Sequence, residues 1–186
     1  SFNQSLLLLP EKHKDRALDV HVQLAETCCI MGMWSCGITH FRAAVSLQPT
    51  NALLHFNRGN AMLNERGNRT SEMAVPHFEQ ALSLNPSRDD FRAHLGVALV
   101  KSGQTERAHL ALEACLQSDN LDLHIFVAFS IEELVPALTI AHLERCVGID
   151  SGRKLAAHAQ RTSVYYRLGR LYRAAGRLDD EHTLFE

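Results

Sequence analysis

The chain has 186 residues, of which 46% are hydrophobic and 22% charged, a balance typical of a globular protein and not of a disordered one. Its formal net charge of -2 provides no overall field that would attract nucleic acid or an anionic membrane, so neither is expected as a partner. No apolar run approaches the roughly 18 residues that a membrane-spanning helix needs, so no membrane span is expected.

A nine-residue pattern recurs along the chain at residues 2–10, 41–49 and 78–86. Each copy begins with Phe, has a small residue three positions later and Leu six positions later, and ends with Pro. The same register continues in a more degenerate form from Leu112 and from Leu143, and its bulky position returns at Phe185. The interval between bulky positions ranges from 31 residues (112 to 143) to 42 residues (143 to 185). A regular recurrence on this scale predicts a repeat architecture.

A second, small position precedes the bulky one by a fixed interval. The interval is 16 residues from Ala25 to Phe41, from Gly96 to Leu112 and from Gly169 to Phe185, and 19 residues from Gly59 to Phe78. The longer interval indicates three extra residues between the helices of the second repeat, in the polar stretch 65–72. Small residues at this position predict that two helices approach closely there, while the bulky position is expected to fill the gap between one hairpin and the next.

With these phases the chain resembles the tetratricopeptide-repeat (TPR) family. The last unit carries the resemblance best, in Tyr165 to Gly176 with Phe185, followed by residues 95–103 with Ala108 and Leu112. The unit 121–151 lacks the glycine and is the weakest match. The resemblance implies an all-α, right-handed α-solenoid of antiparallel helix-turn-helix repeats over almost the whole chain.

The expected units are 1–17 (the tail of a preceding repeat), 18–51, 52–88, 89–120, 121–151 (degenerate) and 152–186 (incomplete). The expected helices are 18–31, 35–48, 52–65, 71–85, 88–102, 105–118, 121–132, 135–149, 153–175 and 178–186. Both ends fall inside a unit, so the chain is interpreted as a fragment of a longer array.

Several residues are expected at the helix ends. Ser71 and Thr105 are candidate N-caps, and Pro49 and Pro86 are expected to close second helices. Glycines are expected to end four first helices, as C-terminal glycines do: Gly32, Gly67, Gly103 and Gly176.

The sequence carries no phosphate-binding loop, nucleophile elbow or paired-carboxylate motif, so no enzyme activity, catalytic residue or cofactor is expected. His40, His77 and His142 share one repeat phase, which places them on successive hairpins about 10 Å apart, too far to share an ion. Cys28, Cys29 and Cys36 with His40 form a local group of ligand types, but the spacing matches no zinc module. We expect no metal site, and interpret Cys28, Cys115 and Cys146 as small buried apolar residues.

An odd number of cysteines without a tight framework favours a reducing, intracellular and probably cytoplasmic location, that is, odds of about three to one. Glycosylation sequons at Asn3 and Asn68 leave a secretory lumen as the alternative.

The resemblance implies that the first helices line a concave groove that receives a partner peptide or subunit. The candidate partner-binding residues are Val22, Glu26, Leu53, Phe56, Asn60, Leu63, Val97, Tyr166, Arg170 and Arg173. The alternative for the apolar members is that they pack against neighbouring repeats. The arginines between 161 and 177 are interpreted as a solvated face, with docking of an acidic partner as the alternative.

One partner class is argued against. Family members that bind the C-terminal tails of heat-shock chaperones use basic and amide side chains at positions that correspond here to Val22, Glu26, Asn57, Asp90 and His94. Only Asn57 fits, and the two carboxylates would repel a C-terminal carboxylate.

The sequence thus predicts an interaction scaffold within a multiprotein assembly. The alternatives are the substrate-recruiting arm of a larger enzyme whose catalytic domain lies outside this chain, and an architectural segment whose groove is filled by its own chain.

Overall fold

A computed structural model describes residues 11–65, 68–150 and 158–185, and these residues form an all-helical array without a strand. The helices are α2 (Glu11–Ile30), α3 (Trp34–Leu47), α4 (Ala52–Asn64), α5 (Asn68–Leu84), α6 (Asp89–Lys101), α7 (Thr105–Cys115), α8 (Leu121–Ile131), α9 (Pro136–Asp150), α10 (His158–Ala174) and α11 (Leu178–Phe185). No helix in this part of the chain is long and apolar enough to cross a membrane.

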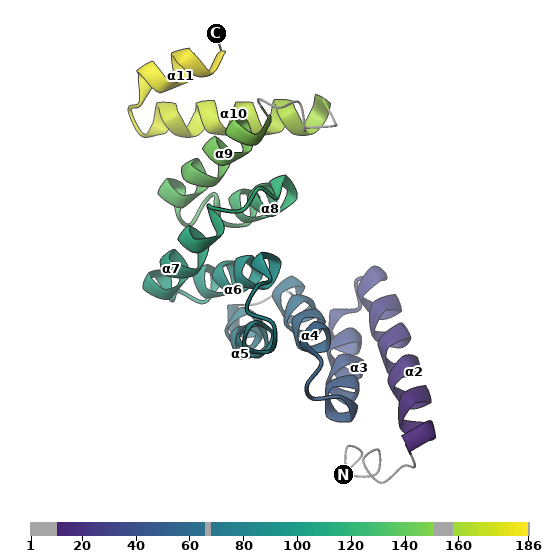
Figure 1. Ribbon diagram of the computed structural model, residues 1–186. Helices are drawn as coiled ribbons and strands as arrows, with labels where there is room; N and C mark the ends of the chain where they lie inside the picture. The colour runs from purple at the N-terminus through teal and green to yellow at the C-terminus, as the bar shows by residue number, and fades with distance from the viewer. Residues whose placement is uncertain (1–10, 66–67, 151–157, 186) are drawn as a thin grey trace.

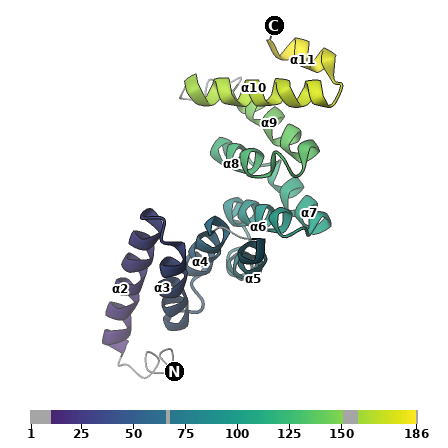
Figure 2. The same ribbon diagram turned by 180° about the vertical axis from the view of Figure 1, so that it is seen from behind.

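Consecutive helices pair as hairpins, and each hairpin packs on the next. The pairs are α2 with α3, α4 with α5, α6 with α7, α8 with α9 and α10 with α11. Neighbouring hairpins meet through α3 and α4, α5 and α6, α6 and α8, and α9 and α10. Figure 1 shows the array running from α2 at one end to α11 at the other, and Figure 2 shows the same progression from behind. The predicted helical repeat architecture is confirmed.

The predicted helices correspond to the observed ones, with differences at their ends. α2 begins at Glu11 and not at residue 18, because residues 11–17 contain no helix breaker and extend the helix back to Pro10. These residues therefore belong to the first described hairpin, not to the tail of a preceding repeat. The extra residue tract predicted for the second hairpin lies across the α4–α5 turn, of which residues 66–67 are outside the described chain.

Both predicted N-caps were wrong. Ser71 lies inside α5 and is buried, because the helix begins at Asn68; the neighbouring Thr70 hydroxyl donates a hydrogen bond back to the Glu65 carbonyl, 3.1 Å away. Thr105 is the first residue of α7, and its N-cap is Gln104, which makes no side-chain capping bond.

The observed side-chain caps are two asparagines. The Oδ1 atom of Asn51 accepts hydrogen bonds from the backbone N–H groups of Leu53 (3.0 Å) and Leu54 (3.4 Å) at the start of α4. Asn120 does the same for Leu123 at the start of α8, at 3.2 Å. Each satisfies a donor that the first turn of a helix leaves without an intrahelical partner.

The glycines predicted to end first helices do so where the structure describes them. Gly32, Gly103 and Gly176 have φ angles of 72°, 80° and 73°, the left-handed conformation that favours glycine at a helix C-terminus. Gly67 lies outside the described residues.

The small and bulky positions of the repeat meet within a hairpin. A Cβ atom added to Gly59 would lie 3.0 Å from Cε1 of Phe78, and one added to Gly96 would lie 2.4 Å from Cδ2 of Leu112. Glycine therefore allows α4 and α6 to approach their partner helices closely. The bulky residue thus covers the small residue of its own hairpin, in addition to the predicted packing against the next.

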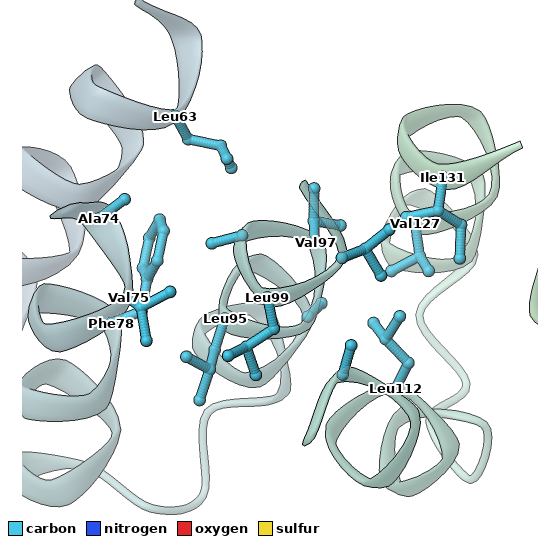
Figure 3. Packing of buried hydrophobic residues seen from close by; sticks show 14 of the residues in the cluster. Leu63, Ala74, Val75, Phe78, Leu95, Val97, Leu99, Leu112, Val127 and Ile131 are labelled. Atoms are coloured by element: carbon cyan, nitrogen blue, oxygen red, sulfur yellow. The ribbon is translucent and has the colours of Figure 1, made fainter. Parts of the chain in front are cut away.

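The central core joins the second, third and fourth hairpins. Phe78, Val97, Leu99, Leu112 and Ile131 are fully buried in it. Figure 3 shows the side chains of α5, α6, α7 and α8 converging there, with Leu112 pointing toward the space between α6 and α8. A separate cluster around Leu143, Val164 and Leu168 joins α9 to α10.

Candidate functional site: the groove between α2 and α4

An open groove separates α2 from α4, the first helices of two successive hairpins. A cavity of about 370 Å³ occupies one part of it and a cavity of about 330 Å³ the other. Glu26 and Asn57 line both cavities, so the two are continuous. The first is lined by Leu18, Asp19, Val22, Gln23, Glu26, Gln48, Asn51, Leu53, Leu54 and Asn57. The second is lined by Glu26, Cys29, Ile30, Trp34, Phe41, Asn57, Asn60 and Ala61.

The lining has three kinds of side chain. Asp19 and Glu26 place carboxylates on the α2 wall, and no lysine or arginine is among the described residues that line either cavity. Asn57 and Asn60 place amides on the α4 wall. Leu53 is 49% exposed at the edge of the first cavity. The groove therefore combines negative charge, amide donors and acceptors, and apolar surface in contact with solvent.

Four predicted partner-binding residues lie in this groove: Val22, Glu26, Leu53 and Asn60. Two others are corrected, because Leu63 and Val97 are buried in the central core and do not offer their side chains to a partner. The physical reason is that α6 packs directly against α4 and α8, so the helix face that is open on α2 is covered farther along the array.

Phe56 is half-buried in a line of rings that joins the second, third and fourth hairpins. Its ring centroid lies 4.7 Å from that of Phe91 in a stacked arrangement and 4.8 Å from that of His94 in an edge contact. The His94 ring in turn stacks on Phe126 of α8 at 4.1 Å. Phe56 thus has the packing role that the sequence left as the alternative.

The predicted arginine stripe on α10 is engaged by acids of neighbouring segments. The Glu132 carboxylate, which is buried, accepts hydrogen bonds from both Arg167 and Arg170. Arg173 pairs with Glu181 of α11. Tyr166, at 68% exposure, remains open to solvent beside Arg161, Thr162 and Tyr165, with which it lines a shallow cavity of about 530 Å³.

Sequence comparison at equal repeat phase missed a pairing of histidines within hairpins. The Nδ1 atoms of His21 and His40 lie 3.1 Å apart, and those of His124 and His142 lie 2.9 Å apart. The His55 and His77 rings face each other at 6.1 Å between centroids. Burial, with a smaller contribution from His124, lowers the pKa of His142 to about 4. Burial, together with Arg58 and His55, also lowers the pKa of His77 to about 4.

The cysteines divide into two kinds. Cys115 and Cys146 are fully buried, and burial raises the pKa of each thiol to about 12, which agrees with their interpretation as unreactive apolar residues. Cys28 is buried as predicted, but its sulfur is joined to that of Cys36 at the start of α3, a pairing that the sequence analysis did not foresee.

Comparison with solved structures identifies the fold. The MamA protein superposes with a TM-score of 0.67 at 14% sequence identity, covering 92% of this chain and 89% of MamA. PilF of Pseudomonas aeruginosa gives a TM-score of 0.65 at 15% identity, covering 93% of this chain and 75% of PilF. YrrB, described as a TPR protein with an unusual peptide-binding site, gives 0.57 at 17% identity, covering 88% of this chain and 80% of YrrB.

No protein-family model matches the sequence, and no curated protein matches it. The fold is that of the TPR proteins, as the sequence predicted, and it is of the kind that serves as a protein-interaction scaffold.

Proposed function

We propose that this chain is a protein-interaction scaffold that holds a segment of a partner protein in the groove between α2 and α4. The observation that carries the proposal is the groove itself, with its two continuous cavities between helices that pack tightly elsewhere in the array. A peptide-binding site in a protein of similar fold, YrrB, supports the assignment of the function to such a surface.

The lining indicates the chemistry of the bound segment. An extended segment carries backbone N–H and C=O groups that the amides of Asn57 and Asn60 can bind, since each amide both donates and accepts. Leu53 and Val22 provide apolar contacts at the first cavity. Asp19 and Glu26 favour lysine or arginine in the partner and disfavour a carboxylate. We therefore expect a neutral or basic segment, bound along its length and not through a C-terminal carboxylate.

The proposal is tested by affinity purification with quantitative mass spectrometry from the cells that express the chain. Leu53→Asp places a charge at the edge of the groove, where the side chain is 49% exposed, so it should remove partners without unfolding the protein. Leu110→Asp is the matched control, because Leu110 is 72% exposed on α7 and lies away from the groove. Partners retained by Leu110→Asp and lost with Leu53→Asp support the proposal, and partners equally retained by both variants contradict it.

A further inference from the structure

A cluster of metal-ligand side chains lies at the closed end of the first hairpin. Cys28 is in the last turns of α2, Cys36 is in the first turn of α3, and His40 is one turn farther along α3. The spacing of four residues places Cys36 and His40 on one face of α3. One ligand atom from each of the three residues lies within 4.8 Å of the other two.

The backbone holds these residues in place. The Met33 N–H donates to the Cys28 carbonyl at 2.8 Å, and the Gly32 N–H donates to the Cys29 carbonyl at 3.0 Å, across a turn in which Gly32 has a φ of 72°. Gly37 allows α3 to approach α2, because a Cβ atom at that position would lie 2.5 Å from the Cys29 sulfur. The Cα atoms of Cys28 and Cys36 are consequently 5.9 Å apart.

His21 supports the third member of the cluster. Its Nδ1 atom lies 3.1 Å from Nδ1 of His40, so the two rings share a hydrogen bond from one helix of the hairpin to the other. A hydrogen bond to the second nitrogen of a ligating histidine fixes the ring orientation in many metal sites. His40 bound to His21 through Nδ1 has Nε2 left for a metal ion.

We propose that the reduced form of this hairpin binds a zinc-class divalent ion through the thiolates of Cys28 and Cys36 and a ring nitrogen of His40, with His21 as a positioning residue. Two sulfur ligands and one imidazole suit Zn²⁺, and water or an external ligand completes the tetrahedron. Metal-ligand bonds of this kind place ligand atoms roughly 3.3–3.8 Å apart, so the three side chains need to contract by about 1 Å. Cys36 and His40 are only half-buried, which leaves the cluster accessible to an ion.

The disulfide and the metal site exclude each other, because both use the same two sulfur atoms. A dithiol reductant transfers two electrons and two protons to the Cys28–Cys36 disulfide, giving two thiols while the reductant forms a disulfide of its own. Metal binding then displaces the two thiol protons. The cluster lies beside the groove, since Cys29 and Phe41, the sequence neighbours of Cys28 and His40, line its second cavity.

Cobalt titration of the protein tests the proposal. Under anaerobic conditions and with a phosphine reductant, one equivalent of Co²⁺ should produce a thiolate-to-cobalt charge-transfer band and the visible bands of a four-coordinate ion, both removed by Zn²⁺. The oxidised protein should show neither. Cys28→Ser, Cys36→Ser and His40→Ala should abolish tight binding, and Cys29→Ser is the matched control that should retain it. His21→Ala should keep the charge-transfer band but weaken binding about tenfold to a hundredfold.

A measurement on the unmodified protein covers the case in which a variant fails to fold. Zinc should slow the alkylation of Cys28 and Cys36 in the reduced protein, resolved by fragment mass spectrometry, while Cys29 reacts at its zinc-free rate. The absence of a cobalt band from the reduced protein, a band lost only with Cys29→Ser, or alkylation unaffected by zinc would each overturn the proposal.

Discussion

Nδ1 of His124 lies 2.9 Å from Nδ1 of His142, and neither side chain is exposed to solvent. Nε2 of His124 lies 2.9 Å from the carbonyl oxygen of Ser118, which can only accept, so Nε2 carries the proton. In the neutral ring Nδ1 of His124 is then the acceptor, and His142 donates. The pair links α8 to α9 with both rings neutral, and a second proton would place a charge in the core.

Acid should therefore destabilise the protein through its buried histidines. The pKa of His142 is about 4 in the folded chain and about 6.5 in an unfolded one, so the unfolded state binds more protons between these values. The free energy of unfolding should be unaffected above pH 6.5 and fall as the pH decreases from about 6.5 to about 4. His142→Gln removes this group while keeping hydrogen-bonding capacity, and should flatten the dependence measured by urea unfolding. The partly exposed His109→Gln is the control, and equal slopes for the two variants would contradict the account.

Gly96→Ala should destabilise the third hairpin by about 1–3 kcal/mol, because its new Cβ would lie 2.4 Å from the fully buried Leu112 side chain. Gly148→Ala is the control on α9, where an added Cβ meets no atom within 4 Å. This second variant should be neutral or more stable by up to about 1 kcal/mol, since alanine favours the helix. Thermal or denaturant unfolding measures both, and the same sign of change in the two variants would count against the packing described.

Glu132→Gln should loosen the contact of α10 with the fourth hairpin. The Glu132 carboxylate is buried and binds two guanidinium groups, those of Arg167 and Arg170, so losing its charge should cost about 1–3 kcal/mol. Hydrogen exchange of α10 should become faster. Glu133→Gln changes an adjacent, exposed carboxylate and should leave exchange as it is; acceleration in this control alone would refute the assignment.

Phe56→Ala should lower the free energy of unfolding by about 1–3 kcal/mol, because the half-buried ring stacks on Phe91 and meets the edge of His94. Leu53→Ala, one turn earlier on the same helix, should change stability by less than about 0.5 kcal/mol. Comparing the two by urea unfolding separates the packing face of α4 from its groove face. A larger loss at Leu53 would reverse that assignment.

The periodic positions predicted the fold because each phase has a steric task. Glycine at 59 and 96, followed by a bulky residue one helix later, encodes the closeness of the paired helices, and the structure places Phe78 and Leu112 on those glycines. Helix ends were harder to predict. Ser71 and Thr105 have the chemistry of caps but lie within helices, whereas the caps at Asn51 and Asn120 follow from where the preceding turn delivers the chain.

The candidate site was predictable only in part, because phase alone does not tell whether a face is covered. Val22 and Leu53 line the groove, while Val97, at the corresponding face of α6, is buried by the direct contact of α6 with α4 and α8. The histidine pairs were missed because histidines at equal phase on different hairpins were compared. His21 and His40 differ in phase and meet across one hairpin, a separation of 19 residues that the small-to-bulky interval could have indicated.

The most direct test of the scaffold proposal is calorimetric binding of peptides selected by display against the folded chain. We expect the selected peptides to be neutral or basic, to bind without a free C-terminal carboxylate, and to lose at least tenfold in affinity with Asn57→Ala or Leu53→Asp but not with Leu110→Asp. Glu26→Lys should weaken basic peptides and favour acidic ones, since Glu26 lines both cavities of the groove. Peptides that bind Leu53→Asp and Glu26→Lys as tightly as the unmodified chain would contradict the assignment of partner binding to this groove.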